Sequence, residues 1–120
     1  MQTTENVTEP QQTDNPSRIA ALNDRFRQTY WGGNIMTTSG MNELKEDTRA
    51  AVFAAVMHYD NFNEDNDPYG EHDFGKVVID GQDFFWKIDY YDHTMNFGSE
   101  NPADPKVTTR VLTIMLASEY

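Results

Sequence analysis

The clearest alternation of apolar and polar residues lies on the two sides of Asp80-Gly81. Two β-rich runs flank this dipeptide, a pattern typical of a two-residue type I′ hairpin turn. With Asp80-Gly81 as the loop, Val77 faces Phe84 and Gly75 faces Trp86. A period of two then sorts the side chains onto two faces of the hairpin. The core face is predicted to hold Val77, Ile79, Phe84, Trp86, Ile88 and Tyr90, and the other face Phe74, Lys76, Val78, Phe85, Lys87, Asp89 and Tyr91.

Apolar residues recur with helical spacing in three other segments. The first helix is predicted from Ser17 to about Tyr30, with Asp24, Arg25 and Arg27 facing solvent, and Gly32-Gly33 ends it. A second helix is predicted to end at Tyr59, starting near residues 43–45. A last helix is predicted to start at Asp104-Pro105, because Asp is a good N-cap and Pro suits the first helical position. Short strands are expected at residues 35–38 and 95–97.

These elements predict an α+β fold in which helices pack mainly on one face of a small antiparallel sheet. The sheet is expected to have three to four strands, with the hairpin at its centre. Residues 1–16 are polar and rich in Gln, Thr, Asn, Glu and Pro, which predicts a disordered acidic and polar tail. Residues 17–120 are predicted to form a single α+β domain, a size that can bury a core of its own.

The net charge of −11 changes the picture of possible partners. It disfavours direct binding to nucleic acid, which depends on Lys and Arg neutralising phosphate. It permits binding to a basic protein, although acidity can also serve solubility alone. The chain has no cysteine, and no apolar run approaches the roughly 20 residues of a membrane span. We therefore expect a cytoplasmic protein that does not enter a membrane.

The first candidate for chemistry is a histidine next to the hairpin. Extending the hairpin register backwards places His72 opposite Asp89, with Lys87 one step along the same face. A carboxylate can orient an imidazole as a general base, so His72, Asp89 and Lys87 are the catalytic candidates. The same residues can also form a cross-strand ion pair without catalytic purpose.

Metal binding is the second candidate for chemistry, and it is weaker. The available ligands are Asp67, Glu71, His72 and Asp73. The segment fails as a calcium loop because Tyr69 occupies a ligand position and Lys76 stands where the closing Glu should be. The acidic residues are better explained as turn caps, so we expect no metal and no other cofactor.

The third candidate is a binding surface for another protein. Aromatic side chains anchor such interfaces, and here they alternate with charges on the outer face of the hairpin. Packing of these rings beneath another part of the chain is an equally good explanation. The predicted surface comprises Phe74, Lys76, Phe85, Lys87, Asp89 and Tyr91, with Asp67, Glu71 and Asp73 from the acidic loop. The wide apolar surface of the predicted last helix offers a place for a homo-oligomer contact.

Three segments resemble a family of small bacterial proteins catalogued as a domain of unknown function. They are NDPYGEHDFG at residues 66–75, FFWKIDYYD at residues 84–92, and TTRVLTIML at residues 108–116, preceded by PADP at residues 102–105. The resemblance covers most of the chain beyond the tail and implies no activity. It implies an accessory role, since the members of the family look like products of accessory genes, many of which are carried on plasmids and other mobile elements.

Two functions from different classes follow from these observations. The preferred one is a small acidic protein-interaction module or inhibitor, an accessory factor of a mobile element that acts on a host protein. The alternative is a metal-assisted or acid–base enzyme centred on the His72/Asp89 region. The first is preferred because of the acidic charge and the family resemblance.

Overall fold

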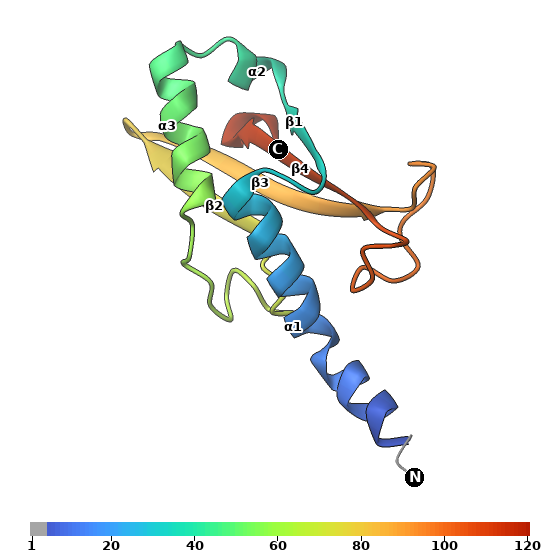
Figure 1. The fold of residues 1–120 in the computed structure, drawn as a ribbon. Coiled ribbons are helices and arrows are strands. Elements are labelled where there is room, and N and C mark those ends of the chain that lie inside the picture. The colour runs from blue at the N-terminus through green and yellow to red at the C-terminus, as the bar shows by residue number, and fades with distance from the viewer. Residues whose placement is uncertain (1–4) are drawn as a thin grey trace.

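Figure 1 shows the computed structural model of the protein, which describes the backbone from Glu5 and side chains from Asn15 to Tyr120. The described residues form four helices of different length and four strands, with long loops at residues 58–73 and 92–108. In chain order the elements are α1 (Glu5–Thr29), β1 (Asn34–Thr37), α2 (Ser39–Asn42), α3 (Glu46–Met57), β2 (Phe74–Ile79), β3 (Gln82–Tyr91), β4 (Thr109–Leu116) and the 3₁₀ helix η1 (Ala117–Glu119).

The strands form one sheet in the order β1-β4-β3-β2. β2 and β3 are antiparallel, as are β3 and β4, whereas β1 lies parallel to β4. Helices α1 and α3 both lie on the same face of this sheet (Figure 1). The predicted α+β class and the helices on one face are thereby confirmed. The sheet is mixed rather than wholly antiparallel, and the hairpin lies at one side of it rather than at the centre, because β2 is an edge strand.

The hairpin has the predicted register. Ile79 pairs with Gln82, Val77 with Phe84, and Gly75 with Trp86. Asp80 and Gly81 have φ angles of 53° and 79°, the positive values that a type I′ turn requires at both central residues. The turn conformation and the two faces of the hairpin depend only on residues close together in the sequence, so this part of the fold could be predicted from the sequence.

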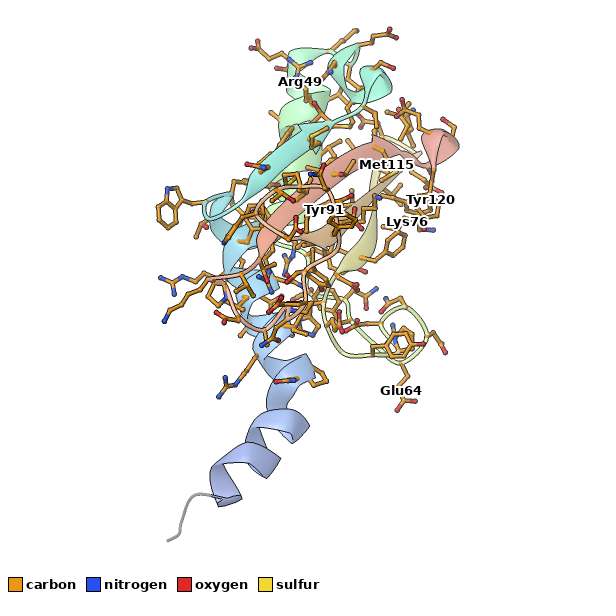
Figure 2. All side chains as sticks on the ribbon, turned by 90° about the vertical axis from the view of Figure 1, so that its right-hand side faces the viewer. Arg49, Glu64, Lys76, Tyr91, Met115 and Tyr120 are labelled. Atoms are coloured by element: carbon orange, nitrogen blue, oxygen red, sulfur yellow. The ribbon has the colours of Figure 1, made fainter. Side chains whose placement is uncertain are left out.

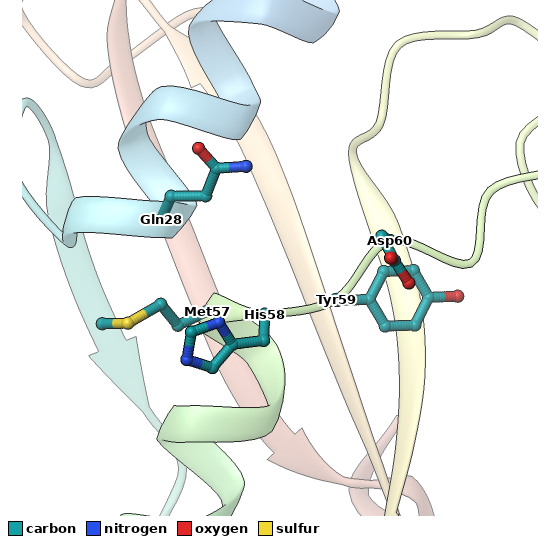
Figure 3. Close-up of a pocket in the computed structure, with 5 residues that line it drawn as sticks. All are labelled: Gln28, Met57, His58, Tyr59 and Asp60. Atoms are coloured by element: carbon teal, nitrogen blue, oxygen red, sulfur yellow. The ribbon is translucent and has the colours of Figure 1, made fainter.

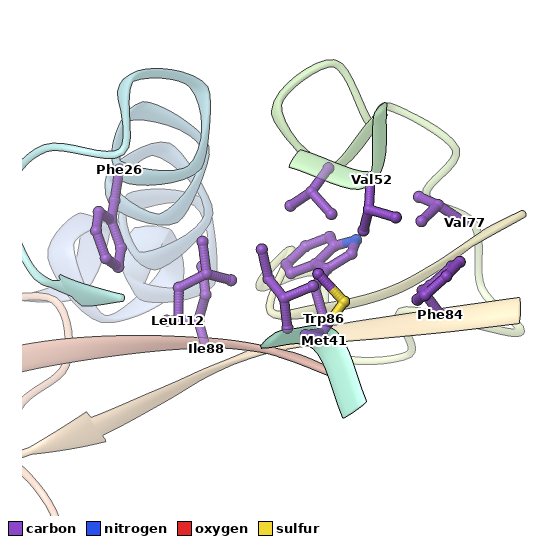
Figure 4. Close-up of a cluster of buried hydrophobic side chains, with 10 residues drawn as sticks. Phe26, Met41, Val52, Val77, Phe84, Trp86, Ile88 and Leu112 are labelled. Carbon is purple, nitrogen blue, oxygen red and sulfur yellow. The ribbon is translucent and has the colours of Figure 1, made fainter. Parts of the chain in front are cut away.

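The hydrophobic core lies between the sheet and the two longer helices (Figure 4). Trp86 and Phe84 of β3 are fully buried, as are Val52 and Val56 of α3. Gly75 faces Trp86, and its lack of a side chain makes room for both the indole and the Tyr59 ring. The core therefore uses the hairpin face that the alternation of residues predicted.

The predicted last helix is wrong, because residues 109–116 form the central strand β4. Arg110, Leu112 and Ile114 are buried on the helix-covered face, and Val111 and Met115 are buried on the other. A strand buried on both faces reads as a continuous apolar run, which periodicity alone does not separate from a helix. Asp104 does cap a turn, since its Oδ1 accepts a hydrogen bond from the Lys106 backbone amide, but no helix follows.

The first helix also differs from the prediction. α1 begins at Glu5 rather than at the predicted Ser17. The disordered tail expected over residues 1–16 stays a prediction, and residues 1–4 lie outside the described residues. Arg27, expected to face solvent, is only 1% exposed. Residues 95–97, expected to be a strand, form a turn, and only Gly98 bridges to Tyr91. Among the described residues, no helix has both the length and the apolar content needed to span a bilayer.

Candidate functional site

The face of the sheet turned away from α1 and α3 is not covered by either of these helices (Figure 1), and the C-terminal Tyr120 packs on its Phe74 and Phe85 rings. Lys76, Met115 and Tyr120 lie on this side (Figure 2). The pairing of the strands shows which side chains are neighbours on this face. Across three strands, Lys76, Phe85 and Met115 lie side by side, as do Phe74, Lys87 and Thr113. We call this surface the open sheet face; it comprises Met36, Phe74, Lys76, Val78, Phe85, Lys87, Asp89, Tyr91, Val111, Thr113, Met115 and the C-terminal Tyr120.

Aromatic rings form the centre of the open sheet face. The Phe74 and Phe85 ring centroids are 5.2 Å apart, and the Tyr120 ring lies 5.7 Å and 5.3 Å from them. Met36, Val78 and Tyr120 are 56%, 54% and 73% exposed. Three exposed apolar side chains and a group of three aromatic rings therefore share one face of the sheet, and exposed apolar surface of this kind can mark an interaction site.

Charged pairs border these rings. Lys87 Nζ lies 2.9 Å from Asp89 Oδ2, and Lys76 Nζ lies 3.9 Å from Asp83 Oδ2. The hydrogen bond to Asp89 raises the pKa of the Lys87 amine above its usual range. The six hairpin residues of the predicted binding surface therefore do share one face, and their role in binding stays a prediction.

The three loop residues predicted for the same surface are engaged elsewhere. The Asp67 carboxylate is 6% exposed and accepts a hydrogen bond from the His72 backbone amide at 3.2 Å. Glu71 accepts a hydrogen bond from the Tyr90 hydroxyl at 2.9 Å. Burial, reinforced by the neighbouring Glu71, raises the pKa of the Asp73 carboxyl. The carboxylates of Asp67 and Glu71 therefore hold the loop in place and do not form part of the open sheet face.

The predicted pairing of His72 with Asp89 is wrong. The β2–β3 ladder ends at Phe74 and Lys87, and the positive φ of His72, 57°, turns the chain away. The His72 ring instead binds Asp24 of α1, with Nδ1 3.0 Å from each carboxylate oxygen. Asp89 pairs with Lys87 on the opposite face of the sheet.

His72 belongs to a chain of polar groups that joins α1, α3 and the loop of residues 58–73. Asp24 also accepts a hydrogen bond from Arg27 Nη2 at 2.8 Å, and Arg27 Nη1 donates to the carbonyls of Val56 and Met57 at the end of α3. Phe62 stacks flat on the His72 ring at 3.9 Å between centroids. The guanidinium of Arg27 lies over the Phe62 and Trp86 rings.

A second chain of buried polar groups links α1 to β3 and β4. Asn23 donates to the Tyr90 hydroxyl at 2.8 Å and to the Glu71 carbonyl at 2.9 Å, and its Oδ1 accepts from Arg110 Nε at 2.8 Å. Burial raises the pKa of the Tyr90 hydroxyl and lowers that of Arg110. The fully paired Asn23 therefore fixes the position of α1 on the sheet.

The α1 residues of these two networks of polar groups were not predicted from the sequence; they are Asn23, Asp24 and Arg27. A signal for two of them existed, since Asn23 and Arg27 are four residues apart and fall within the apolar stripe of the helix. Polar residues within such a stripe are buried and need partners. Their partners are far away in the sequence and could not be named in advance.

The weak metal candidates Asp67, Glu71, His72 and Asp73 do not converge on one point. Within the described part of the chain, no three His, Cys, Asp or Glu side chains come together in a way that could hold a metal ion. Asp67 and Glu71 make the hydrogen bonds given above, and these leave them turned toward different partners.

Hollows formed by the described residues include three beside α1 and α3. One, of about 410 Å³, is lined by Gln28, Met57 and His58 where α3 ends beside α1 (Figure 3). One of about 540 Å³ lies along α3 beside Tyr30, and one of about 310 Å³ lies beside Trp31. His72 lines none of these three, so the structure gives the histidine no adjoining substrate pocket among them.

Fold and surface together define a small α+β protein with a polar layer beneath its helices and an aromatic open sheet face. The chain belongs to the family described as "Protein of unknown function (DUF3768)", whose model matches residues 37–119. No significant match is found among curated proteins or among solved structures. α1, which supplies Asn23, Asp24 and Arg27, lies outside the matched residues.

Proposed function

We propose that this protein is a binding module for another protein and that the open sheet face is its contact surface. The observation that carries the proposal is the exposure of Met36, Val78 and Tyr120 around the Phe74–Phe85 ring pair, on a face that α1 and α3 leave uncovered. Aromatic and methionine side chains supply much of the binding energy at protein interfaces. The strands hold these groups rigidly, which lowers the entropy lost on binding.

Charge supports a basic partner. The chain carries a net charge of −11, and Asp80 and Asp83 are exposed at the hairpin tip, where Asp83 pairs with Lys76. The negative charge of the whole chain attracts a basic surface and speeds its association, with a dependence on salt concentration. The partner we propose is a protein with an apolar patch inside a basic rim; the family resemblance points to a host protein inhibited by a mobile-element factor.

The proposed function is tested by comparing which host proteins bind to the wild type and to variants with a changed surface. The tagged full chain is incubated with host lysate at low salt, next to Met36→Glu on the open sheet face and Ala54→Glu on the exposed side of α3. Both variants add one negative charge at an exposed residue. We expect one or more proteins to be retained by the wild type and by Ala54→Glu, and lost from Met36→Glu.

A photo-crosslinking amino acid at Phe85 then separates a specific contact from adhesion. We expect it to join the retained protein covalently, whereas the same group at Ala54 should not. Equal retention by both glutamate variants would overturn the proposal, as would crosslinking only from α3. Sedimentation of the purified chain identifies the case in which the captured protein is a second copy of the same chain.

The enzyme alternative receives less support from the geometry. Asp89, the predicted partner of His72, lies on the other face of the sheet, and His72 binds Asp24 instead. His72 Nε2 faces Asp67 Oδ2 at 3.7 Å, so the second ring nitrogen is turned toward another carboxylate of the protein. Both ring nitrogens thus have acidic neighbours within the fold, which suits a structural tie better than a base acting on substrate.

A further inference from the structure

The hollow beside Trp31 has an unusual combination of linings. It has a volume of about 310 Å³ and lies between the end of α1, the turn that follows it and the segment before β4. Leu22 and Phe26 give it an apolar wall, and its charged lining residues are Arg25 and Arg110. No carboxylate lines it, although the chain carries 20 Asp and Glu residues against 9 Lys and Arg.

Arg110 is a buried cation whose close partners are neutral. The residue is 4% exposed, and its guanidinium donates to Asn23 Oδ1 and to the carbonyl of Pro102. It also lies 5.3 Å from the centroid of the Tyr90 ring. No carboxylate of the described residues lies within ion-pair distance of the Arg110 guanidinium. The nearby Glu71 carboxylate accepts a hydrogen bond from the Tyr90 hydroxyl instead. A buried charge without a counter-ion is costly, and an anion in the pocket would offset that cost.

Arg25 and Trp31 add a second cation and an aromatic ring to the lining of this pocket. Arg25 is exposed and lies three residues after Leu22 on the same side of α1. The Trp31 ring is 81% exposed and stands in the turn between α1 and β1. An indole held in the open at the edge of a pocket offers a flat surface on which a planar ring can stack. Asp104, which precedes the lining residue Pro105 in the sequence, accepts a hydrogen bond from the Lys106 backbone amide.

We infer that this pocket binds a small organic anion, in which a phosphate or carboxylate group is joined to a planar ring. The anionic group lies between Arg25 and Arg110, whose planar guanidinium groups suit both phosphate and carboxylate. The ring stacks on Trp31 and contacts the apolar wall. The site is separate from the open sheet face, so this inference does not depend on the proposed protein partner.

The two tryptophans of the chain allow a direct measurement. Trp31 is exposed and Trp86 is fully buried, so quenching by an added ligand reports on Trp31. The full chain is titrated with AMP, which carries a phosphate and a planar base, and with benzoate, which carries a carboxylate and a ring. We expect saturable quenching by at least one, and the stronger of the two identifies the anionic group. Inorganic phosphate and adenosine, each with half of the proposed chemistry, should bind more weakly.

Variants separate the site from general charge effects. Arg25→Gln should weaken binding by about tenfold, as expected from the loss of one charged hydrogen bond. Lys45→Gln removes the same charge from an exposed residue at the start of α3 and should leave the affinity unchanged. Trp31→Leu, followed by calorimetry, should lose the preference for AMP over inorganic phosphate.

Three results would overturn the inference. They are no saturable binding of AMP or benzoate, equal affinity in Arg25→Gln and Lys45→Gln, or equal binding of adenosine and AMP. Arg25 is exposed and makes no side-chain hydrogen bond within the described residues, so its variant should fold normally. The circular dichroism spectrum of each variant checks this before titration.

Discussion

The Asp24 carboxylate binds the His72 ring, with both oxygens 3.0 Å from Nδ1. The contact joins α1 to the end of the loop that precedes β2, residues that are 48 positions apart. The same carboxylate accepts a hydrogen bond from Arg27, which also binds the end of α3. Asp24 therefore connects three segments that meet on the core side of the sheet.

Asp24→Asn should destabilise the protein. The amide keeps the size of the side chain but leaves the buried Arg27 guanidinium without its carboxylate. We expect the free energy of unfolding to fall by about 1.5–3 kcal/mol, the usual effect of losing a hydrogen bond to a charged group. Urea unfolding followed by circular dichroism measures it. Asp65→Asn, at an exposed position in the loop, is the control and should be close to neutral; similar losses in the two variants would contradict the role of Asp24.

Gly75→Ala should also destabilise the protein, for a steric reason. An added Cβ would collide with the indole nitrogen of Trp86 and approach the Tyr59 ring to 2.8 Å. Overpacking of this kind costs about 1–3 kcal/mol. Gly98→Ala is the matched control, since its Cβ would have no neighbour closer than 3.8 Å. Thermal unfolding of the two variants provides the comparison, and equal melting temperatures would show that the core adapts to the extra methyl group.

Asp73→Asn should stabilise the protein at neutral pH. Burial and Glu71 raise the pKa of the Asp73 carboxyl above its ordinary value of 3.8, so the folded state binds this proton more tightly than the unfolded state does. Ionisation of Asp73 therefore lowers stability as the pH rises from about 3.8 through the raised pKa. The variant lacks this titration, and its advantage should shrink as the pH falls toward 3.8. Chemical unfolding at a series of pH values tests this; a wild type that is more stable at neutral pH would contradict it.

Glu119→Gln should have the opposite pH dependence. The Thr38 hydroxyl, together with the backbone amides of Leu116 and Gly40, lowers the pKa of the Glu119 carboxyl below its ordinary value of 4.5. The ionised carboxylate thus stabilises the folded state above 4.5, and this contribution is lost as the pH falls through the lowered pKa. The wild type should exceed the variant in stability at neutral pH and match it in acid. Glu100→Gln, at an exposed loop position, should show no such difference.

The hairpin and its two faces could be predicted because their causes are local. Asp80 and Gly81 accept positive φ, and the period of two in the flanking residues then fixes which side chains point inward. The same alternation placed Phe74, Phe85, Lys87 and Asp89 together on the outer face. Their gathering on one surface was thus predictable before any tertiary contact was known.

The partner of His72 could not be predicted in the same way. A pairing of His72 with Asp89 requires the β2–β3 ladder to continue past Phe74, whereas the positive φ of His72 ends it. Asp24 was expected to face solvent, and only the docking of α1 on the sheet brings its carboxylate to the imidazole. A local pattern carries no information about which distant segment fills the adjoining space.

The sequence by itself determined the turn at Asp80-Gly81, the core side of the hairpin and the helices ending near Tyr30 and Tyr59, since these depend on spacing and turn chemistry within a few residues. Only the tertiary structure decided that residues 109–116 are a central strand, because the apolar residues there satisfy either a helix or a strand buried on both faces. It also decided that the carboxylates of Asp67 and Glu71 turn inward, since their partners come from other segments of the fold.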